Sequence, residues 1–315
     1  MLSTAPVPKF SSMESPYHPG ELWVQQKVGE EKMATSNGKV IADRVPNGAL
    51  KFIDKQPMVV ISTQDKNSAI WVSVLAGQPG FVVTKDGTEI TISKTLLVSS
   101  HEDIFFQNIN ENASVGLLFI ELATRRRLRV NGKIQVSKDH LTIKVAQAYP
   151  NCPKYIQRRE MDVRLNPSLA AYTIKKGQSL NEDLKLWFRS ADTLFVGSAD
   201  AQDEMDASHR GGNTGFIEVV DDYTIKVPDY AGNSMFNTLG NFVLNPKAGI
   251  LLIDFKTGNT LQATGTTELI WPTHENKDGT NGSKRYWLFH VDEWMVTNTL
   301  SNTTWTFLEY SPFNP

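Results

Sequence analysis

The chain has 315 residues, enough for about two domains with substantial hydrophobic cores. Its formal net charge of −2 at pH 7 gives no overall positive field, which argues against a nucleic-acid or anionic-membrane partner. No apolar run reaches membrane-spanning length, and the single cysteine, Cys152, excludes a disulfide within the chain.

The N-terminal residues predict neither export nor a membrane anchor. The first six residues, MLSTAP, lack the charged start and apolar core of a secretory signal. With a single cysteine, this start favours a reducing, cytoplasmic location. The N-x-S/T sequons at Asn112, Asn281 and Asn302 are then expected to carry no meaning.

Residues 1–50 are expected to form an N-terminal arm and one helix. Residues 1–17 are rich in Ser and Pro and predict a disordered or extended arm. The sequence His18-Pro19-Gly20-Glu21 is typical of a helix start, because Pro fits the first turn and an acidic residue suits its positive end. The helix is expected to end before Asn37-Gly38. His18 is more simply a cap or surface residue than a ligand-binding one.

From Met58 onward, short apolar or alternating segments predict strands. In the first half they are Met58–Ser62, Ala69–Leu75, Thr88–Ile92, Val115–Glu121, Arg125–Val130 and Leu141–Ala146. Asn131-Gly132 predicts a hairpin turn. The expected organisation is a first β domain at residues 51–160, a connector with an entry helix at 161–185, and a second β domain at 186–315, with strands resuming at Thr193–Gly197.

The second half of the chain repeats the first. An offset of 135 residues aligns Ser73, Gly77, Gly80 and Phe81 with Ser208, Gly212, Gly215 and Phe216. An offset of 133 residues aligns Gly116, Leu118, Ile120, Leu128 and Gly132 with Gly249, Leu251, Ile253, Leu261 and Gly265. Because the order of matches is kept, the sequence predicts two similar β domains in tandem.

The stretch from Ser208 to Phe216 combines glycines with a His and an Arg. Glycine lets a backbone approach a ligand closely, and the planar fork of Arg210 suits phosphate. A Gly-rich hairpin is the simpler alternative. The stretch is expected to be a loop, held by strands at Phe216-Ile217 and at Phe242–Leu244. The first half has Val74-Leu75-Ala76 where the second has His209-Arg210-Gly211, so the second copy is expected to hold the site.

Several motifs together resemble those of a known family. In the second half they are Asp206–Gly212, Gly215-Phe216, Tyr230–Asn233, Gly240-Asn241 and Asn245-Pro246; in the first half they are His18–Glu21, Thr124–Gly132 and Asn151–Gln157. Through these residues the chain resembles the pyridoxamine 5′-phosphate oxidase-like family of FMN-binding split barrels. The resemblance covers residues 18–315.

The resemblance implies a mainly β protein with a few helices, built of two tandem six-stranded Greek-key barrels with FMN where two barrels meet. The halves would pair within one chain as a pseudo-dimer, or each chain would pair with another in a homodimer; the sequence does not decide. Some relatives continue after a Ser-Pro-x-Asn-Pro segment, matched by Ser311–Pro315, into flavin reductase and ferredoxin-like modules. A separate flavin reductase or other electron donor is therefore an expected partner if the substrate does not supply the electrons.

The resemblance and the residue chemistry together give the expected FMN-binding residues. They are Ser208, His209, Arg210, Gly211, Gly212, Asn233, Asn241, Lys154 and Tyr155. Arg210 is expected to bind the FMN phosphate, with Ser208 and the backbone of the two glycines assisting, and Lys154 is a further cation for it. His209 is expected to bind flavin or phosphate or to cap the turn. The two asparagines suit flavin carbonyl and ring-nitrogen positions, or left-handed turns.

Other polar residues give weaker signals. Arg127 or Arg129 would turn toward an anionic ligand, although each alone is more simply part of a solvated strand edge. Cys152 has no His-and-acid arrangement around it and is expected to be a structural thiol. No metal site is expected, because no His, Cys or acidic spacing of a known metal motif is present. No catalytic residue is identified.

The expected function is that of an FMN-dependent oxidoreductase that accepts a hydride from a small-molecule substrate and passes the electrons to oxygen or another acceptor. The chain lacks a P-loop, a Rossmann fingerprint and a G-x-S-x-G elbow, which disfavours nucleotide hydrolysis, a dinucleotide fold and serine hydrolysis. A non-catalytic flavin- or haem-binding module is the alternative, because a fold alone does not fix an activity.

Overall fold

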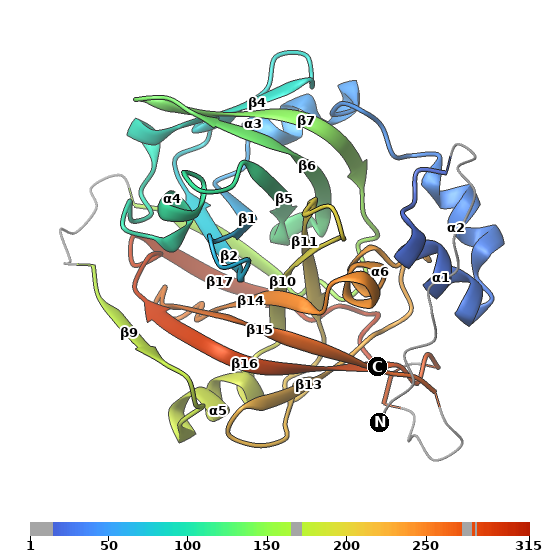
Figure 1. Ribbon diagram of the computed structural model, residues 1–315. Coiled ribbons are helices and arrows are strands. Elements are labelled where there is room, and N and C mark those ends of the chain that lie inside the picture. The colour runs from blue at the N-terminus through green and yellow to red at the C-terminus, as the bar shows by residue number, and fades with distance from the viewer. Residues whose placement is uncertain (1–14, 165–171, 273–278, 281) are drawn as a thin grey trace.

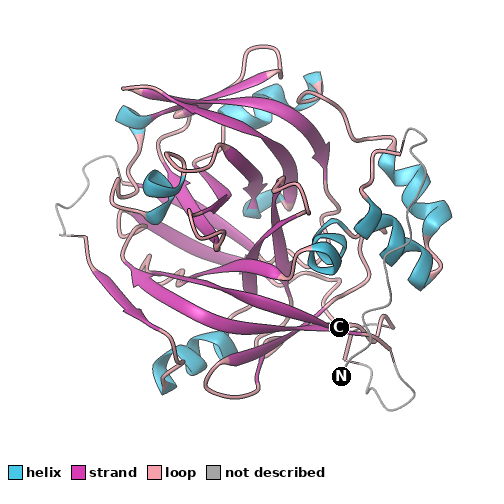
Figure 2. Cartoon of the chain, viewed as in Figure 1, coloured by secondary structure: helices cyan, strands magenta, loops and turns pink. Residues whose placement is uncertain are grey.

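The computed structural model describes residues 15–164, 172–272, 279–280 and 282–315. Its architecture is mainly β, as expected. Two large antiparallel sheets curl into open barrels that lie against each other, with short helices around their edges (Figure 1, Figure 2). Within the described residues, no helix is long and apolar enough to cross a membrane.

Each barrel has six longer strands and one two-residue strand. The first contains β1 (Met58–Gln64), β2 (Ile70–Ala76), β3 (Val82–Val83), β4 (Glu89–Ser93), β5 (Ser114–Glu121), β6 (Arg126–Val136) and β7 (His140–Pro150). The second contains β10 (Thr193–Ala199), β11 (Met205–Gly211), β12 (Glu218–Val219), β13 (Thr224–Pro228), β14 (Lys247–Ile253), β15 (Thr260–Ile270) and β16 (Tyr286–Thr297). Their orders, β2-β1-β5-β6-β7-β4-β3 and β11-β10-β14-β15-β16-β13-β12, are the same.

The strand registers confirm the internal repeat residue by residue. Val60 pairs with Leu118 in the first barrel, and Phe195 pairs with Leu251 in the second. The pairing of β5 with β6 matches that of β14 with β15 in the same way, so that Arg129 and Gln262 occupy equivalent positions opposite two leucines. The two halves therefore pair their strands identically, although their sequences differ at the polar positions.

The barrels pair with each other within the chain, because their inner strands are apolar on both faces. In β1, Val59 and Ile61 enter the core of the first barrel, whereas Met58 and Val60 enter a separate cluster between the barrels. Phe195 and Leu251 of the second barrel join that cluster. The sheet contacts are reciprocal: β11 lies against β5 and β6, and β2 lies against β14 and β15. The structure thus shows the intrachain pseudo-dimer.

Two equivalent glycines allow the strands to cross closely at this interface. A Cβ atom on Gly116 would lie 2.6 Å from the carbonyl carbon of Asp206, and one on Gly249 would lie 2.5 Å from the carbonyl oxygen of Ile70. Both distances are shorter than a carbon atom tolerates. Glycine is therefore required at these positions by backbone packing rather than by a turn.

The N-terminal helix differs from the prediction. It is broken into α1 (Pro19–Val28) and α2 (Glu31–Gly38), because Gly29 takes a left-handed conformation (φ 72°) and its N–H caps the first helix. The predicted role of His18 as a cap is confirmed: its side chain accepts from the N–H of Gly20. The arm before residue 15 lies outside the described residues.

The remaining helices are short: α3 (Leu50–Asp54), α4 (Ile104–Asn108), α5 (Glu182–Ser190) and α6 (Asn237–Leu244), with 3-10 turns at Asn47–Ala49, Lys94–Leu96 and Leu122–Thr124. The described residues contain three further strands: β8 (Arg158–Val163), β9 (Ile174–Gly177), which joins the second sheet through β16, and β17 (Thr303–Glu309). Strand β8 follows the first barrel and pairs with β17, which follows the second. The predicted connector therefore contains β9, which pairs with β16, and the start of α5.

Four local predictions are wrong. The strand expected at Phe216-Ile217 is absent there, since the two residues lie just before β12 (Glu218–Val219). Asn131-Gly132 is not a turn: β6 runs through it with a bulge, and Gly132 is needed because its Cβ would lie 2.2 Å from the oxygen of Lys144. The predicted loop at Ser208–Arg210 is the end of strand β11. The predicted strand at Phe242–Leu244 is part of α6, whose apolar residues pack into the second core.

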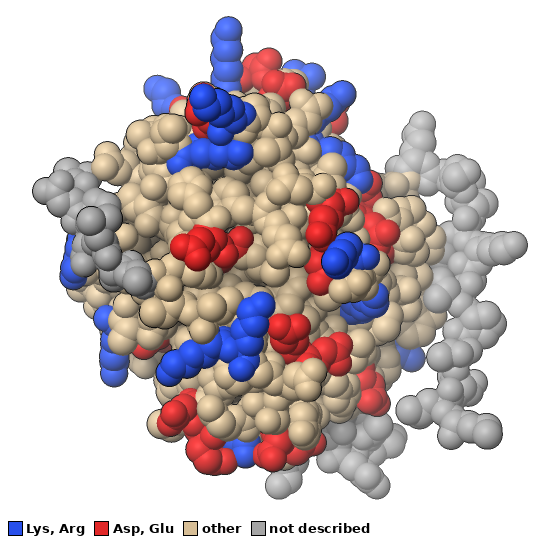
Figure 3. All heavy atoms as spheres, turned by 60° about the vertical axis from the view of Figure 1, so that its left-hand side comes forward, with Lys and Arg blue, Asp and Glu red and all other residues tan. Residues whose placement is uncertain are grey.

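Charges of both signs are interspersed on the face drawn in Figure 3, separated by uncharged surface. This arrangement agrees with the small net charge of the whole chain. The concentration of positive charge in this protein is found instead inside a pocket, as described below.

We expect Gly116→Ala to lower the free energy of unfolding by about 1–3 kcal/mol, because the added Cβ meets the backbone of Asp206 and the barrels must shift apart. Chemical denaturation measures the change. Gly48→Ala is the matched control, since a Cβ there meets nothing within 4 Å. Equal stability of the two variants would show that the barrels do not cross as described.

Candidate functional site

A pocket lies where the two barrels meet. Strands β6 and β11, the segment after β7 and the segment between β13 and α6 form its walls. The lining residues are Leu118, Arg127, Arg129, Asn151, Cys152, Lys154, Tyr155, Ser208–Gly211, Pro228–Tyr230, Gly232–Ser234 and Phe236–Leu239. Its cavity volume of about 90 Å³ has room for several water-sized groups, and hence for a phosphate group.

The lining carries far more positive than negative charge. Four cationic side chains line the pocket, Arg127, Arg129, Lys154 and Arg210, whereas Asp229 is the single acidic residue among those lining it. The first three come from the first barrel and Arg210 comes from the second. Four cationic side chains and one acidic side chain around one pocket favour a negatively charged ligand, because the ligand would offset the repulsion among the cations.

Arg129 is a fixed part of the pocket floor. Its Nε donates to the carbonyl oxygen of Ala207 (3.0 Å), and its Nη2 donates to the hydroxyl of Ser208. Its Nη1 lies 3.4 Å from Asp206, and donates to the hydroxyl of Tyr149 at 3.0 Å. These contacts tie β6 of the first barrel to β11 of the second, so the same side chain joins the barrels and shapes the pocket.

Arg127 has no acidic partner among the described residues. Its Nε donates to the carbonyl oxygen of Cys152 (2.7 Å), and its Nη1 lies 3.4 Å from Nδ1 of His209. Burial, together with the charges of Arg210 and Arg129, lowers the pKa of Arg127 to about 9. A guanidinium held in this environment gains most from an anion placed beside it.

His209 is a buried, neutral donor. Burial lowers the pKa of His209 well below its usual value, and the charges of Arg127 and Arg210 lower it further. Since Arg127 can only donate, Nδ1 of His209 must accept and Nε2 must carry the proton. That Nε2 is buried and has no hydrogen-bond partner among the described residues. It is therefore available to an acceptor atom of a ligand.

Asp229 lies between Arg210 and Arg285 and holds Arg210 at the opposite wall of the pocket. The Nη2 of Arg210 lies 4.0 Å from Asp229, whose other oxygen accepts from Nε of Arg285 at 2.9 Å. The Nε of Arg210 is buried and, within the described part of the chain, has no partner. The guanidinium of Arg210 is thus held in one orientation, and it keeps at least one donor for a ligand.

The start of helix α6 faces the pocket and is uncapped. Phe236, at the N-cap position, has a left-handed conformation (φ 60°) and supplies no side-chain hydrogen bond to the helix. Asn237, Thr238 and Leu239, the first residues of the helix, line the pocket. Free N–H groups at the positive end of a helix suit an anion. The sequence pattern indicates no helix here, so this feature is not among the predicted ones.

Two aromatic rings are among the side chains that line the pocket. The rings of Tyr155 and Tyr230 lie 4.9 Å apart at an angle of 39°. The Tyr155 hydroxyl donates to the carbonyl oxygen of Ala231 (3.0 Å), and its backbone is left-handed (φ 65°). Lys154 precedes it, with its ammonium group 5.8 Å from the ring of Phe313.

The structure brings seven of the nine predicted binding residues to the pocket. These are Ser208, His209, Arg210, Gly211, Asn233, Lys154 and Tyr155. Gly212 is not among the lining residues, and its N–H already donates to the carbonyl oxygen of Asp192 (3.2 Å). Asn241 also lies outside: it accepts from His18 and donates to Ser198 and Asp206. Both are placed for structure rather than for ligand contact.

Arg127 and Arg129 both line the pocket. The sequence favoured a solvated strand edge for each of them over a position that faces a ligand. The sequence indicated a hairpin turn directly after this segment, which would end the strand there. In a longer strand the side chains alternate between the two faces, so both arginines would point to the same face. Gly211 serves packing as well, since a Cβ there would lie 2.1 Å from the oxygen of Tyr155.

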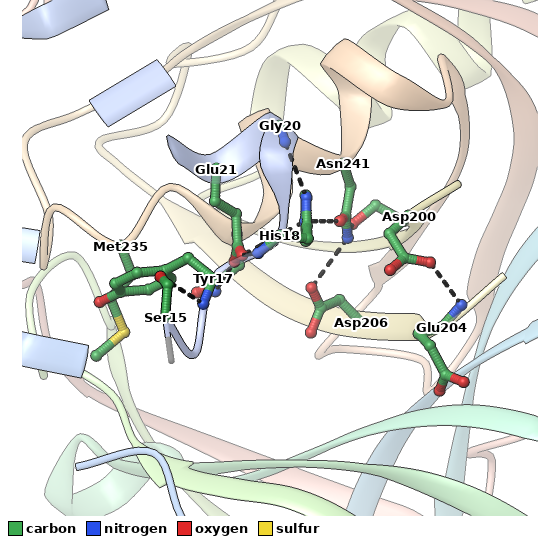
Figure 4. A network of polar contacts seen from close by, with 12 residues as sticks. Ser15, Tyr17, His18, Gly20, Glu21, Asp200, Glu204, Asp206, Met235 and Asn241 are labelled. Atoms are coloured by element: carbon green, nitrogen blue, oxygen red, sulfur yellow. Dashed lines mark hydrogen bonds and ion pairs between the residues drawn. The ribbon is translucent and has the colours of Figure 1, made fainter. Parts of the chain in front are cut away.

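A buried polar network connects the pocket floor to helix α1 (Figure 4). The N–H of Gly20 donates to Nδ1 of His18 (3.1 Å), so Nε2 of His18 carries a proton and donates to Asn241 (2.8 Å). Asn241 in turn donates to Asp206 (2.9 Å), which is the partner of Arg129. Each member thereby fixes the orientation of the next.

Glu21 is enclosed by the same network. Its carboxyl accepts from the N–H of His18 (2.8 Å) and from the side chain of Asn237, which lines the pocket. A Cβ on Gly240 would lie 2.6 Å from Cγ of Glu21, so α1 and α6 are in close contact. Burial, reinforced by the charge of Asp206, raises the pKa of Glu21 to about 8. The carboxyl therefore keeps its proton to a higher pH than an exposed glutamate does.

We expect Glu21→Gln to remove a pH dependence of stability. The folded protein keeps the Glu21 proton that the unfolded chain releases between pH 4.5 and about 8, so the parent loses stability as the pH rises through this window. Relative to the parent, Glu21→Gln should gain up to about 1.4 kcal/mol per pH unit there. Denaturation at several pH values measures this. Glu31→Gln, at an exposed position, is the control; curves parallel to the parent for both variants would contradict the shift.

Several solved structures are similar to a part of this chain. Among solved structures, HupZ of Group A Streptococcus is 18% identical and covers 36% of this chain and 90% of its own, with a TM-score of 0.30. A putative pyridoxamine 5′-phosphate oxidase from Lactobacillus delbrueckii is 14% identical and covers 37% and 93%, with a TM-score of 0.29. HutZ, the heme storage protein from Vibrio cholerae, is 17% identical and covers 36% and 89%, with a TM-score of 0.26.

No curated protein is similar enough to match the chain. The family model described as pyridoxamine 5′-phosphate oxidase matches residues 47–164, a span that includes the whole of the first barrel. The second barrel repeats the strand order and register of the first. Residues 47–164 are thus similar to the pyridoxamine 5′-phosphate oxidase family.

Proposed function

We propose that this protein is an FMN-dependent oxidoreductase that binds the cofactor in the pocket between its barrels. The observation that supports the proposal most is the set of cations around Arg127, which has no acidic partner among the described residues. A phosphate dianion beside Arg127, Lys154 and Arg210 would offset most of their positive charge. The uncapped start of α6 adds backbone N–H groups on the same side.

The residues present fit the parts of FMN in different ways. The cationic end of the pocket suits the phosphate. The buried N–H of His209 and the amide of Asn233 are hydrogen-bonding groups for flavin carbonyl oxygens or ring nitrogens. The cavity is smaller than the whole cofactor needs, so the ring would extend toward Tyr155 and Tyr230, whose aromatic faces suit a planar ligand.

When bound, FMN supplies hydride acceptance and electron transfer. The tasks left to the chain are to bind, orient and exclude water. The buried polar groups of β11 are held by pairing with β10 and by Arg129, so they need little reorganisation when a ligand enters. A small-molecule substrate would reach the flavin through the pocket mouth, and the electron acceptor would be oxygen or another oxidant.

A non-catalytic flavin- or haem-binding module is the second candidate, since cations also suit haem carboxylates. The protonation of His209 weighs against a haem iron at this residue. Arg127 donates toward Nδ1, so Nε2 carries a proton and offers no lone pair to a metal. Iron binding by His209 would require Arg127 to move away.

Arg210→Ala should weaken FMN binding by about 10- to 100-fold, because one charge-assisted hydrogen bond to the phosphate is lost. Quenching of FMN fluorescence on titration measures the dissociation constant. Arg189→Ala, at an exposed position on α5, is the matched control and should bind as the parent does. Unchanged affinity of Arg210→Ala would remove Arg210 from the phosphate site.

Purified protein mixed with FMN and passed through a desalting column should retain flavin absorbance. We expect a suitable small-molecule hydride donor to bleach that absorbance without air, and air to restore it. A protein that retains no FMN would exclude the proposed function. Retained flavin that neither donors nor a flavin reductase can reduce would instead support the non-catalytic binding module.

A further inference from the structure

We infer that each chain binds a single FMN, because the position related to the pocket by the internal pseudo-two-fold symmetry is closed by the protein's own side chains. A symmetric pair of barrels has two equivalent clefts between its members. One is the pocket that includes Ser208. The other is centred on Ser73, its equivalent in strand β2. This inference rests on the proposed function.

The strand registers identify the equivalent residues without ambiguity. Val196 pairs with Ser208 as Ile61 pairs with Ser73. Four cationic or polar residues of the pocket have counterparts in the second cleft: Arg127 corresponds to Thr260, Arg129 to Gln262, Arg210 to Leu75, and His209 to Val74. At these four positions the second cleft has no cation.

The backbone contacts around the two clefts are the same despite this loss of charge. Gln262 donates to the carbonyl oxygen of Val72 and to the hydroxyl of Ser73, both at 2.9 Å. Arg129 makes the corresponding contacts to Ala207 and Ser208. The neutral amide thus keeps the contact between the barrels and gives up the positive charge that would attract a phosphate.

A carboxyl group of the protein occupies the second cleft. Ser73 donates to Asp103 (2.5 Å), and Asp103 accepts from the N–H of Phe105 (2.9 Å) at the start of α4. At the equivalent helix start in the pocket, Phe236 supplies no cap. In the second cleft, the donors are therefore used by Asp103 of the chain itself. In the pocket, the equivalent donors are left for an external anion.

The second cleft is also closed to solvent. Ser73 and Gln262 are 0% exposed and Asp103 is 2% exposed, and Leu75 and Thr260, which replace two of the arginines, are 0% exposed. Tyr172, from the segment before β9, lies near the same group: burial raises the pKa of Tyr172 to about 12, and the nearby Asp103 contributes. A phosphate here would have to displace Asp103 and would meet no cation.

The test counts ligands per chain. The full-length protein is saturated with FMN by equilibrium dialysis, and the bound flavin is released by denaturation and compared with the protein concentration. We expect one FMN per chain. Two FMN per chain would overturn the inference and leave the proposed function intact. If no FMN binds, the proposed function fails, and a titration with inorganic phosphate then tests whether the second cleft is closed to anions: one site per chain supports the closure, and two sites or none overturn it.

A matched pair of variants shows which cleft is filled. Ser208→Ala and Ser73→Ala make the same change at equivalent positions, so both remove one hydroxyl between the barrels. We expect Ser208→Ala to weaken FMN binding by about tenfold and Ser73→Ala to leave the dissociation constant unchanged. Weaker binding by Ser73→Ala, with Ser208→Ala unchanged, would place the ligand in the second cleft and overturn the inference. Thermal unfolding without FMN confirms that both variants fold.

Discussion

The close crossing of strands at the barrel interface is the constraint on which the other features depend. Gly116 and Gly249 let the two sheets approach until backbone meets backbone. Only at this separation can Arg129 reach from β6 to the carbonyl oxygen of Ala207 and to Ser208 on β11. The pocket follows from the same approach, because its walls come from both barrels and neither barrel alone contains the full set of cations.

Polar groups in this interface are costly and must be satisfied by one another. Arg129, Asp206 and Asn241 achieve this through hydrogen bonds that continue to His18 on α1. Arg127, His209 and Arg210 are not satisfied to the same degree, since two of them keep a buried donor without a partner in the described structure. The interface therefore combines a satisfied part, which holds the barrels together, with an unsatisfied part, which is suited to a ligand.

Sequence patterns predicted the architecture well where burial on both faces governs the composition of a strand. The continuous apolar strands Met58–Ser62 and Val115–Glu121, and the order of repeated residues, predicted two similar β domains in tandem. The sequence patterns failed where long-range packing overrides a local signal. Asn131-Gly132 has the composition of a turn, yet the close approach of Lys144 uses the glycine as a bulge. Gly29, which breaks the N-terminal helix, was passed over because the later Asn37-Gly38 gave a stronger stop signal.

The site was predicted in part for a related reason. Arg210 and His209 stood out because their aligned partners, Leu75 and Val74, are apolar. Arg127 and Arg129 were undervalued because a run of arginines is usually solvated, and only the crossing of the barrels buries them. Asn241 lies outside the pocket, and a network that includes His18, far away in sequence, uses both of its amide donors and its carbonyl oxygen.

Placing both barrels in one chain has a consequence for how such a protein can change over time. In a symmetric dimer of identical chains, every substitution appears in both clefts, so a mutation that closes one cleft closes the other. Here Gln262 and Arg129 are separate positions and can be altered independently. Covalent fusion thus permits one cleft to specialise in ligand chemistry while its twin becomes a stabilising part of the interior.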